Sequence, residues 1–283
     1  MLRIAVPNKG TLSGPAAQML REAGYRQRTE PRDLICRDEA NDVEFFYLRP
    51  RDIATYVGSG DLDLGITGRD LLIDSGSEAL ELLDLDFAWA TFRFAARAGT
   101  LGPNPEDLAG RRIATSYAGV VARHLTEHQI TADVISLDGA VENAIRLGVA
   151  DVIADVVETG ATLRQAGLET VGEPLLRSAA VLIGRVPVDE PAAGIVQLLR
   201  RLQGVLVARR YVMLAYDVPA DQLDAAVALT PGIESPTISP LRRQGWLAVQ
   251  AMVLRSDVHR IMDELYDSGA RAIIVTDVLA CRL

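Results

Sequence analysis

Cysteine, lysine and histidine are scarce in this 283-residue chain, and no long apolar run occurs in it. Its two cysteines, Cys36 and Cys281, stand far apart and in no Cys-x-x-Cys pattern, which excludes a disulfide framework and a thiolate zinc site. The lack of a membrane-length apolar run and of an export signal at the N-terminus predicts a cytoplasmic protein without a membrane span. We therefore expect a cytoplasmic enzyme or regulator.

Basic residues are fewer than acidic ones, 29 against 38, which gives a net charge of -9. That balance repels a phosphate backbone and argues against nucleic-acid binding. Among the basic residues Lys9 is the only lysine, and it precedes Gly10. Either this lone ammonium reflects drift at a surface turn, or it is a compact point charge for a phosphate; both interpretations stay open at this point.

Short β-branched or apolar runs alternate with helical patterns up to about residue 210, which predicts an α/β fold. Strands are expected at residues 2–6, 43–48, 61–66, 89–96, 113–115, 133–137, 151–155 and 179–183. Helices are expected at residues 13–24, 118–128, 139–147 and 193–209, with a further one beginning near residue 70. Glycine and proline place one boundary near residues 91–105 and another near 187–191, and the acidic run 78–86 is interpreted as a solvated face.

The tail from Tyr211 has a different pattern. Strands are expected at 211–217, 233–239, 246–253 and 272–277, and helices at 219–229 and 256–268. This βαββαβ order is typical of a ferredoxin-like unit, a common regulatory module for small ligands. The order alone does not establish that role.

The most informative stretch runs from Asp151 to Leu163, where an apolar strand ends in Asp155 and passes through the turn Thr159-Gly160-Ala161-Thr162 into a helix. Small residues let the backbone approach a ligand, threonine hydroxyls can donate hydrogen bonds, and free amides at a helix start favour an anion. Spacing alone leaves a phosphate-binding turn and a threonine-capped helix equally open. A carboxylate at the carboxyl end of a strand can accept ribose hydroxyls, so Asp155 favours a sugar-phosphate site.

Other patterns carry little weight. His124, Glu127 and His128 fit the zinc-protease string H-x-x-E-H on an expected helix, but short strings of this kind recur by chance. The glycines of residues 58–65 lack the dinucleotide spacing, because the third falls two positions late. No G-x-x-x-x-G-K-[ST] string occurs, which excludes a P-loop of that type.

The pattern between Glu142 and Leu163 resembles the signature of the ATP phosphoribosyltransferase family, the enzymes that open histidine biosynthesis. Further motifs extend the resemblance over most of the chain: Pro7-Asn8-Lys9-Gly10, Leu48-Arg49-Pro50, Gly65-Ile66-Thr67-Gly68-Arg69-Asp70, and Thr230-Pro231-Gly232 with Ser235-Pro236-Thr237. The βαββαβ tail is similar to that of the long, self-regulated form.

The resemblance implies a core of two lobes like a type II periplasmic binding protein, with the active site in the cleft between them. It implies domains at residues 1–90 with 184–210, at 91–183, and at 211–283. The expected reaction joins adenine N1 of ATP to 5-phosphoribosyl 1-pyrophosphate (PRPP) and releases pyrophosphate. Mg²⁺ carried mainly by the phosphate substrates, feedback inhibition by histidine and assembly into a dimer and a hexamer are also expected, whereas a protein metal site, nucleic acid and membrane are not.

Site residues follow from the same resemblance. The turn is expected to hold the 5-phosphate and ribose of PRPP through Asp155, Val156, Val157, Glu158, Thr159, Gly160, Ala161 and Thr162. Glu142 is expected on the sugar side. Lys9, Gly10, Arg49 and Asp70 are expected to line the facing lobe, toward ATP and pyrophosphate. Asp217, Ile233, Ser235, Thr237 and Ala272 are the expected contacts of histidine.

Two alternatives remain open at this point. A non-catalytic, two-lobed solute-binding protein would use the same cleft and the same helix-start amides, although the sequence shows no export signal. A regulatory module for a separate transferase is the other, but such a module would not be expected to keep the whole pattern from Glu142 to Leu163.

Overall fold

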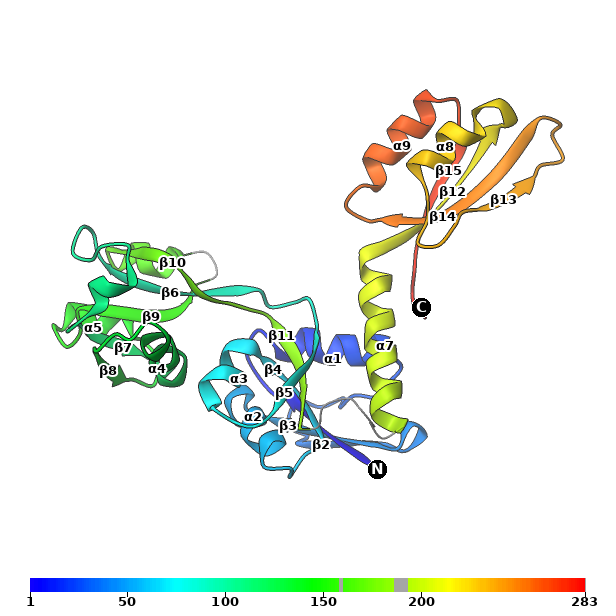
Figure 1. Cartoon of the computed structure of the whole chain (residues 1–283). Helices are drawn as coiled ribbons and strands as arrows, with labels where there is room; N and C mark the ends of the chain where they lie inside the picture. Colours follow the sequence, from blue (N-terminus) through cyan, green and yellow to red (C-terminus); the bar gives the residue numbers. More distant parts are fainter. Residues whose placement is uncertain (158–159, 186–192, 283) are drawn as a thin grey trace. The chain divides into compact units, whose positions relative to one another are not determined.

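The computed structural model describes residues 1–157, 160–185 and 193–282. The chain divides into two compact units, Met1–Arg21 with Tyr25–Ile195, and Glu22–Gly24 with Val196–Leu283. The first unit contains two β-sheets and the second contains one (Figure 1). We call the six-stranded sheet with its helices lobe I and the five-stranded sheet with its helices lobe II.

Lobe I has the strand order β2-β3-β1-β4-β11-β5. Its strands are β1 Leu2–Pro7, β2 Ile35–Asp38, β3 Val43–Leu48, β4 Leu64–Gly68, β5 Leu80–Asp84 and β11 Ala180–Gly184. Its helices are α1 Ser13–Glu22, the short η1 Glu39–Asn41, α2 Pro50–Gly58 and α3 Arg69–Ser75. Residues of α2 pack on β1, β4 and β11. Because β1, β3 and β4 run parallel, their carboxyl ends meet at one edge of the sheet.

Lobe II has the strand order β10-β6-β9-β7-β8. Its strands are β6 Ala90–Arg97, β7 Arg112–Thr115, β8 Asp133–Ser136, β9 Val152–Val157 and β10 Leu168–Ser178. Its helices are η2 Pro105–Leu108, α4 Ala118–Glu127, α5 Glu142–Arg146 and α6 Ala161–Gln165. The helix α4 covers one face of this sheet, and α5 and α6 cover the other. Strands β7, β8 and β9 are parallel, so they too share a carboxyl edge.

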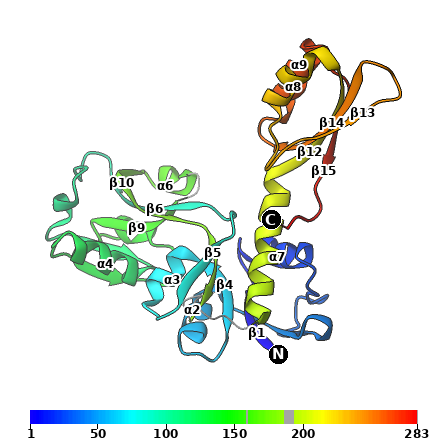
Figure 2. The same ribbon diagram turned by 45° about the vertical axis from the view of Figure 1, so that its right-hand side comes forward.

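The chain crosses between the two sheets twice, between β5 and β6 and again between β10 and β11, and the two crossing segments lie side by side (Figures 1 and 2). The amide of Leu85 donates to the carbonyl of Ala180, and the amide of Ala180 to the carbonyl of Phe87, each at 2.9 Å. The expected boundaries therefore need correction. The first crossing precedes residues 91–105, and β11, expected in lobe II up to residue 183, pairs with β4 and β5 of lobe I.

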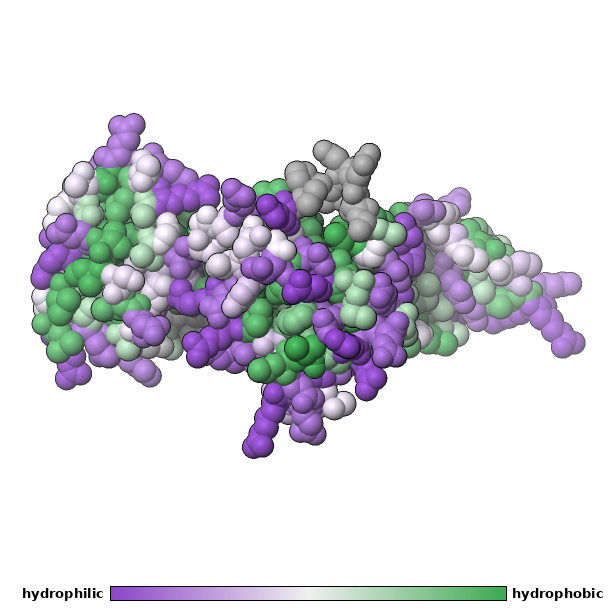
Figure 3. Space-filling view, turned by 90° about the horizontal axis from the view of Figure 1, so that it is seen from below, coloured by the Kyte–Doolittle hydropathy of each residue, from purple (hydrophilic) through white to green (hydrophobic). Residues whose placement is uncertain are grey.

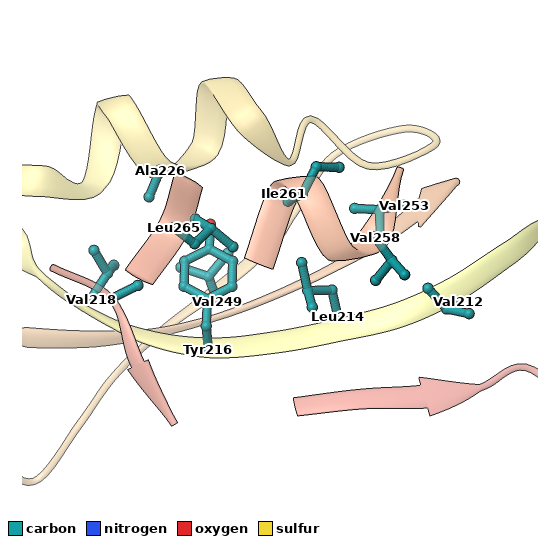
Figure 4. Packing of buried hydrophobic residues seen from close by; sticks show 11 residues of the cluster. Val212, Leu214, Tyr216, Val218, Ala226, Val249, Val253, Val258, Ile261 and Leu265 are labelled. Atoms are coloured by element: carbon teal, nitrogen blue, oxygen red, sulfur yellow. The ribbon is translucent and has the colours of Figure 1, made fainter. Parts of the chain in front are cut away.

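The second unit has the expected ferredoxin-like βαββαβ order, with its sheet arranged β13-β14-β12-β15. Its elements are α7 Ala193–Arg210, β12 Tyr211–Pro219, η3 Ala220–Gln222, α8 Leu223–Leu229, β13 Thr237–Pro240, β14 Trp246–Leu254, α9 Val258–Asp267 and β15 Arg271–Asp277. Alternate residues of β12, namely Val212, Leu214, Tyr216 and Val218, pack with Ile261 and Leu265 of α9 (Figure 4). Strand alternation places this side of the sheet under the helices.

Helix α7 was expected with lobe I, but from Val196 on it counts with the second unit. Its last residues bond to the sheet of that unit. The amide of Arg255 donates to the carbonyl of Arg210 at 2.8 Å, and the Arg255 side chain donates to the carbonyl of Arg209 at 3.1 Å. These bonds tie the end of α7 to Arg255, the residue that follows β14.

Several element boundaries differ from the expected ones. The strand expected at 61–66 is Leu64–Gly68, the helix expected at 139–147 is Glu142–Arg146, and the strand expected at 233–239 begins only at Thr237. Strands β2, β5 and β10 were not expected at all.

On the face shown in Figure 3, hydrophilic side chains are interspersed with hydrophobic ones. No helix in the described part of the chain is long and apolar enough to cross a membrane.

Candidate active site

Asp155 lies near the carboxyl end of β9, beside Arg93 of β6 in the strand register. Its neighbours Ile153 and Val157 pack in the cluster under α5 and α6, so alternation places the half-buried Asp155 on that same side. Burial raises the pKa of the Asp155 carboxyl, and the negative charge of Glu142 raises it further. A hydrogen bond from the Val156 amide to Oδ1 at 2.8 Å opposes that rise. Burial and the charge of Glu142 therefore disfavour the ionised form of Asp155, and a cationic partner would favour that form.

Glu142 is the first residue of α5. The charge of Glu142 reaches Asp155, and the role of both residues on the sugar side stays a prediction. Arg51 and Asp70 of lobe I also act on the Asp155 carboxyl, Arg51 lowering its pKa and Asp70 raising it. Charged groups of both lobes therefore lie close enough to Asp155 to influence it.

The turn after β9 is described only in part. Glu158 and Thr159 lie outside the described residues, and so does the side chain of Thr162. Gly160 has a φ of +69°, a left-handed conformation that glycine adopts without strain, and the short helix α6 begins at Ala161. A Cβ built on Gly160 would lie 3.1 Å from Nη1 of Arg164, so this guanidinium lies over the turn. The expected hydroxyl contacts of Thr159 and Thr162 stay predictions.

Lys9, Arg49 and Asp70 follow the ends of the parallel strands β1, β3 and β4, so lobe I brings them to one edge of its sheet. The amide of Asn8 donates to the carbonyl of Leu48 at 2.8 Å, which joins two of these ends. Lys9 and Gly10 are exposed, and Gly10 has a φ of +75°. Oδ1 of Asn8 is buried and has no hydrogen-bond partner among the described residues.

The Asp70 side chain bonds to Ser178 of lobe II, and its expected role toward ATP and pyrophosphate stays a prediction. Asp70 is 8% exposed. The Ser178 hydroxyl donates to Oδ1 of Asp70 at 2.8 Å and accepts from the Asp70 amide at 3.1 Å. Asp70 therefore links α3 to β10. Burial raises the pKa of the Tyr117 hydroxyl, and the negative charge of Asp70 raises it further.

Four residues that the structure places in or beside the candidate site were not identified from the sequence: Arg51, Tyr117, Arg164 and Ser178. Tyr117 follows the carboxyl end of β7, the position that singled out Asp155 on β9, so the same signal was available. Arg51 lies two residues after Arg49, directly after the quoted motif Leu48-Arg49-Pro50. Ser178 meets Asp70 across 108 residues of sequence, and no local pattern announces that contact.

The expected histidine contacts lie on the sheet of the second unit and in one loop. Asp217 of β12 pairs with Ala248 of β14 and with Arg271 of β15, and Ala272 follows Arg271 with a φ of +51°. Thr237 begins β13, whereas Ile233 and Ser235 lie in the loop before it. Strands β12 and β15 thus bring Asp217 and Ala272 near each other, and the role of all five residues stays a prediction.

His124 and Glu127 of the H-x-x-E-H string lie on α4, and His128 is the residue that caps its C-terminal end. The His124 ring packs edge-on against Phe94 and lies 4.2 Å from the His128 ring, centroid to centroid. Burial lowers the pKa of His124. Within residues 1–157, 160–185 and 193–282, no three His, Cys, Asp or Glu side chains are placed to hold a metal ion.

Comparison with known proteins identifies the family. The family model described as ATP phosphoribosyltransferase matches residues 49–204, and the model described as HisG, C-terminal domain, matches residues 208–280. Curated ATP phosphoribosyltransferases from Salinispora tropica and Streptomyces avermitilis are 71% and 64% identical to this chain, and each match covers the whole of both chains.

A solved structure, an ATP phosphoribosyl transferase (HisG:HisZ) complex from Thermotoga maritima, is 26% identical with a TM-score of 0.62. The match covers 73% of this chain and 98% of that one. The sequence and fold matches agree with each other. The chain belongs to the ATP phosphoribosyltransferase family, in its long form with the C-terminal domain, and is a phosphoribosyltransferase.

Proposed function

We propose that this chain joins N1 of the adenine of ATP to C1 of PRPP and releases pyrophosphate, the first step of histidine biosynthesis. The observation that carries the proposal is Asp155, a half-buried carboxylate at the carboxyl end of β9, within the Glu142–Leu163 pattern of a chain similar to curated ATP phosphoribosyltransferases over its whole length. The carboxyl ends of strands are where open α/β sheets bind their ligands.

The chemistry needs no general base, because adenine N1 carries no proton to remove. As the bond from C1 to the pyrophosphate oxygen stretches, positive charge grows on the ribose and negative charge on pyrophosphate. Preorganised groups aimed at such charges contribute about 3–4 kcal/mol each. Asp155 and Glu142 favour the cationic sugar, and Lys9 and Arg49 favour the departing anion.

Binding and orientation fall to the remaining site residues. The segment from Asp155 to Thr162 holds the 5-phosphate and ribose, and the Arg164 guanidinium over Gly160 adds a positive charge for the phosphate. Gly10 lets the backbone approach the substrate beside Lys9. Asn8 offers a buried Oδ1 that needs a donor, and a substrate hydroxyl or amino group supplies one.

Mg²⁺ fits this site as a companion of the substrates. The described residues hold no group of three metal-ligating side chains, whereas Mg²⁺ commonly takes one or two carboxylates together with substrate phosphates. Glu142 and Asp155 are the carboxylates available on the sugar side. When bound, the ion shields the charge of the pyrophosphate group.

We assign regulation to the second unit, with histidine as the inhibitor. We also propose that the protein assembles into a dimer and a hexamer. The support for the regulatory role is the match of residues 208–280 to the C-terminal family model and the ferredoxin-like sheet that carries Asp217, Thr237 and Ala272. Ile233 and Ser235 complete the proposed contacts from the loop before β13.

The test is turnover. The protein is incubated with ATP, Mg²⁺ and PRPP, and the ultraviolet absorbance of N1-substituted adenine is followed. We expect product only when both substrates are present. Binding of the substrates without turnover would instead favour the two-lobed solute-binding protein, and neither binding nor turnover would favour a regulatory module.

A further inference from the structure

One carboxylate, that of Asp74 near the end of α3, contacts both lobes of the first unit. Its Oδ2 lies 3.0 Å from Nη1 of Arg51 in α2, an ion pair within lobe I. Its Oδ1 accepts the amide hydrogen of Gly119 in α4 of lobe II at 2.9 Å. The Asp74 side chain is only 15% exposed. The two carboxylate oxygens of Asp74 therefore contact different lobes, Oδ2 lobe I and Oδ1 lobe II.

The backbone contact behind this bond is close. A Cβ built on Gly119 would overlap the carbonyl oxygen of Asp74, so a residue with a side chain cannot occupy this position unless one helix shifts. The helices α3 and α4 lie side by side here in both views (Figures 1 and 2). The fold thus uses glycine to bring the start of α4 against the end of α3.

Arg51 extends the same cluster toward the site. Its guanidinium lies 4.4 Å from the ring centroid of Tyr117, the residue before α4, and the charge of Asp70 acts on the Tyr117 hydroxyl. The positive charge of Arg51 also acts on Asp155. Asp74 therefore holds both the Arg51 guanidinium and the start of α4. Loss of the Asp74 carboxylate would release Arg51 and would break the hydrogen bond between the two lobes.

We propose that Asp74 is a positioning residue of the transfer reaction, which sets the alignment of lobe I with lobe II by holding Arg51 and the Gly119 amide. The inference rests on the proposed function. A reaction that uses no general base depends on the geometry of its two substrates, and a displacement of about 1 Å can cost on the order of 100-fold in rate. Groups for the two substrates are expected on opposite lobes, so the contact that aligns the lobes governs turnover.

If Asp74 had a purely structural role, its substitution would leave kcat unchanged. Ion pairs at partly exposed positions contribute little to stability. The chain offers a matched control in Glu44 of β3, which pairs with Arg37 at 2.6 Å and is also 15% exposed. The Glu44 pair lies within lobe I, away from the lobe junction.

The experiment compares kcat and the KM of each substrate for wild type, Asp74→Asn, Asp74→Ala and Glu44→Gln, with Tm measured on each. The asparagine variant keeps an oxygen for the Gly119 amide and loses the charge for Arg51. We therefore expect kcat to fall about 10-fold, and the KM of each substrate to change less than 3-fold. The alanine variant loses both contacts, and we expect a fall of about 100-fold. Glu44→Gln should keep the wild-type kcat.

Hydrogen exchange in the absence of substrates gives a second readout. The Gly119 amide should exchange faster in Asp74→Ala than in Asp74→Asn or wild type. Wild-type turnover together with an unchanged kcat in both Asp74 variants would overturn the inference alone, as would a lower kcat with unaltered Gly119 exchange in Asp74→Ala. A wild-type protein that fails to convert ATP and PRPP would overturn the proposed function and the inference with it.

Discussion

Asp155 is the residue on which the proposed chemistry depends, and its charge state sets a pH requirement. Burial and Glu142 raise the pKa of its carboxyl, so this group takes up its proton at a higher pH than an ordinary aspartate. Only the ionised form stabilises a cationic sugar. We expect kcat/KM to fall as pH drops through this raised pKa, which the pH profile of the wild-type enzyme measures.

Asp155→Asn should lower kcat about 100-fold and remove that acidic limb, because the amide carries no charge at any pH. Asp151→Asn, at the amino end of the same strand, is the control. Arg112 lowers the pKa of Asp151 to about 2, so this pair stabilises the fold at neutral pH and is lost only as pH falls toward that value. An Asp155→Asn enzyme with wild-type kcat and the same pH profile would contradict the assignment.

Ser178 tests the lobe junction at the level of one hydroxyl. Its side chain is buried, donates to the Asp70 carboxylate and accepts from the Asp70 amide. Ser178→Ala leaves both groups without this partner, so we expect a loss of about 1–3 kcal/mol in the free energy of unfolding, measured by chemical denaturation. The exposed Ser59→Ala should change that value by less than about 0.5 kcal/mol. Equal effects of the two variants would show that the junction contributes no more than the surface.

Sequence reasoning located residues whose position follows from a strand end and missed those defined by contacts between lobes. Asp155 and Lys9 follow the rule that ligands bind at the carboxyl ends of strands, and the structure places them there. Ser178 and Arg51 owe their importance to partners that only the folded chain supplies. The buried, unpartnered oxygen of Asn8 likewise requires coordinates, because burial cannot be read from a four-residue motif.

At the scale of elements, the unexpected strands β5 and β10 show how local signals mislead. Strand β10 contains Gly172 and Pro174, both strand breakers, and the sheet accepts them because β10 is an edge strand whose pairing with β6 shifts between Val171 and Leu176. The acidic run 78–86, interpreted as a solvated face, contains β5, whose Glu81 and Asp84 pair with Arg69. Glu78 and Glu81 are exposed, as a solvated face predicts, and an edge position explains why neither β5 nor β10 was expected.

Gly65 tests the packing of α2 on β4. A Cβ at this position would lie 2.5 Å from Cγ2 of Ile53 and 3.0 Å from Cγ2 of Val57, so the helix must move to admit it. We expect Gly65→Ala to lower the free energy of unfolding by about 1–3 kcal/mol, because overpacking strains a dense core.

Gly14 of α1 is the matched control for Gly65, because a Cβ there meets nothing within 4 Å. Gly14→Ala should stabilise the protein by about 0.5–1 kcal/mol, since alanine is the better helix former. A Gly65→Ala protein as stable as Gly14→Ala would show that α2 does not pack on β4 as described. Thermal and urea denaturation of the two variants side by side decide the matter.

At the scale of the whole molecule, the second unit has a hydrophobic core of its own. The cluster under α8 and α9 contains only residues of β12 and beyond, and none of these belongs to the described clusters of lobes I and II. Deletion from Tyr211 onward should therefore leave an active enzyme that histidine no longer inhibits. Turnover at increasing histidine concentrations checks this, and inhibition that persists in the shortened protein would place the effector site elsewhere.

The proposed function depends on where PRPP binds. The decisive measurement is a crystal structure of the protein with PRPP and Mg²⁺. We predict the 5-phosphate in contact with the backbone of the turn at Gly160 and Ala161, with the ribose hydroxyls within hydrogen-bond distance of Asp155. A structure in which this turn has no ligand and PRPP occupies another part of the chain would contradict the account.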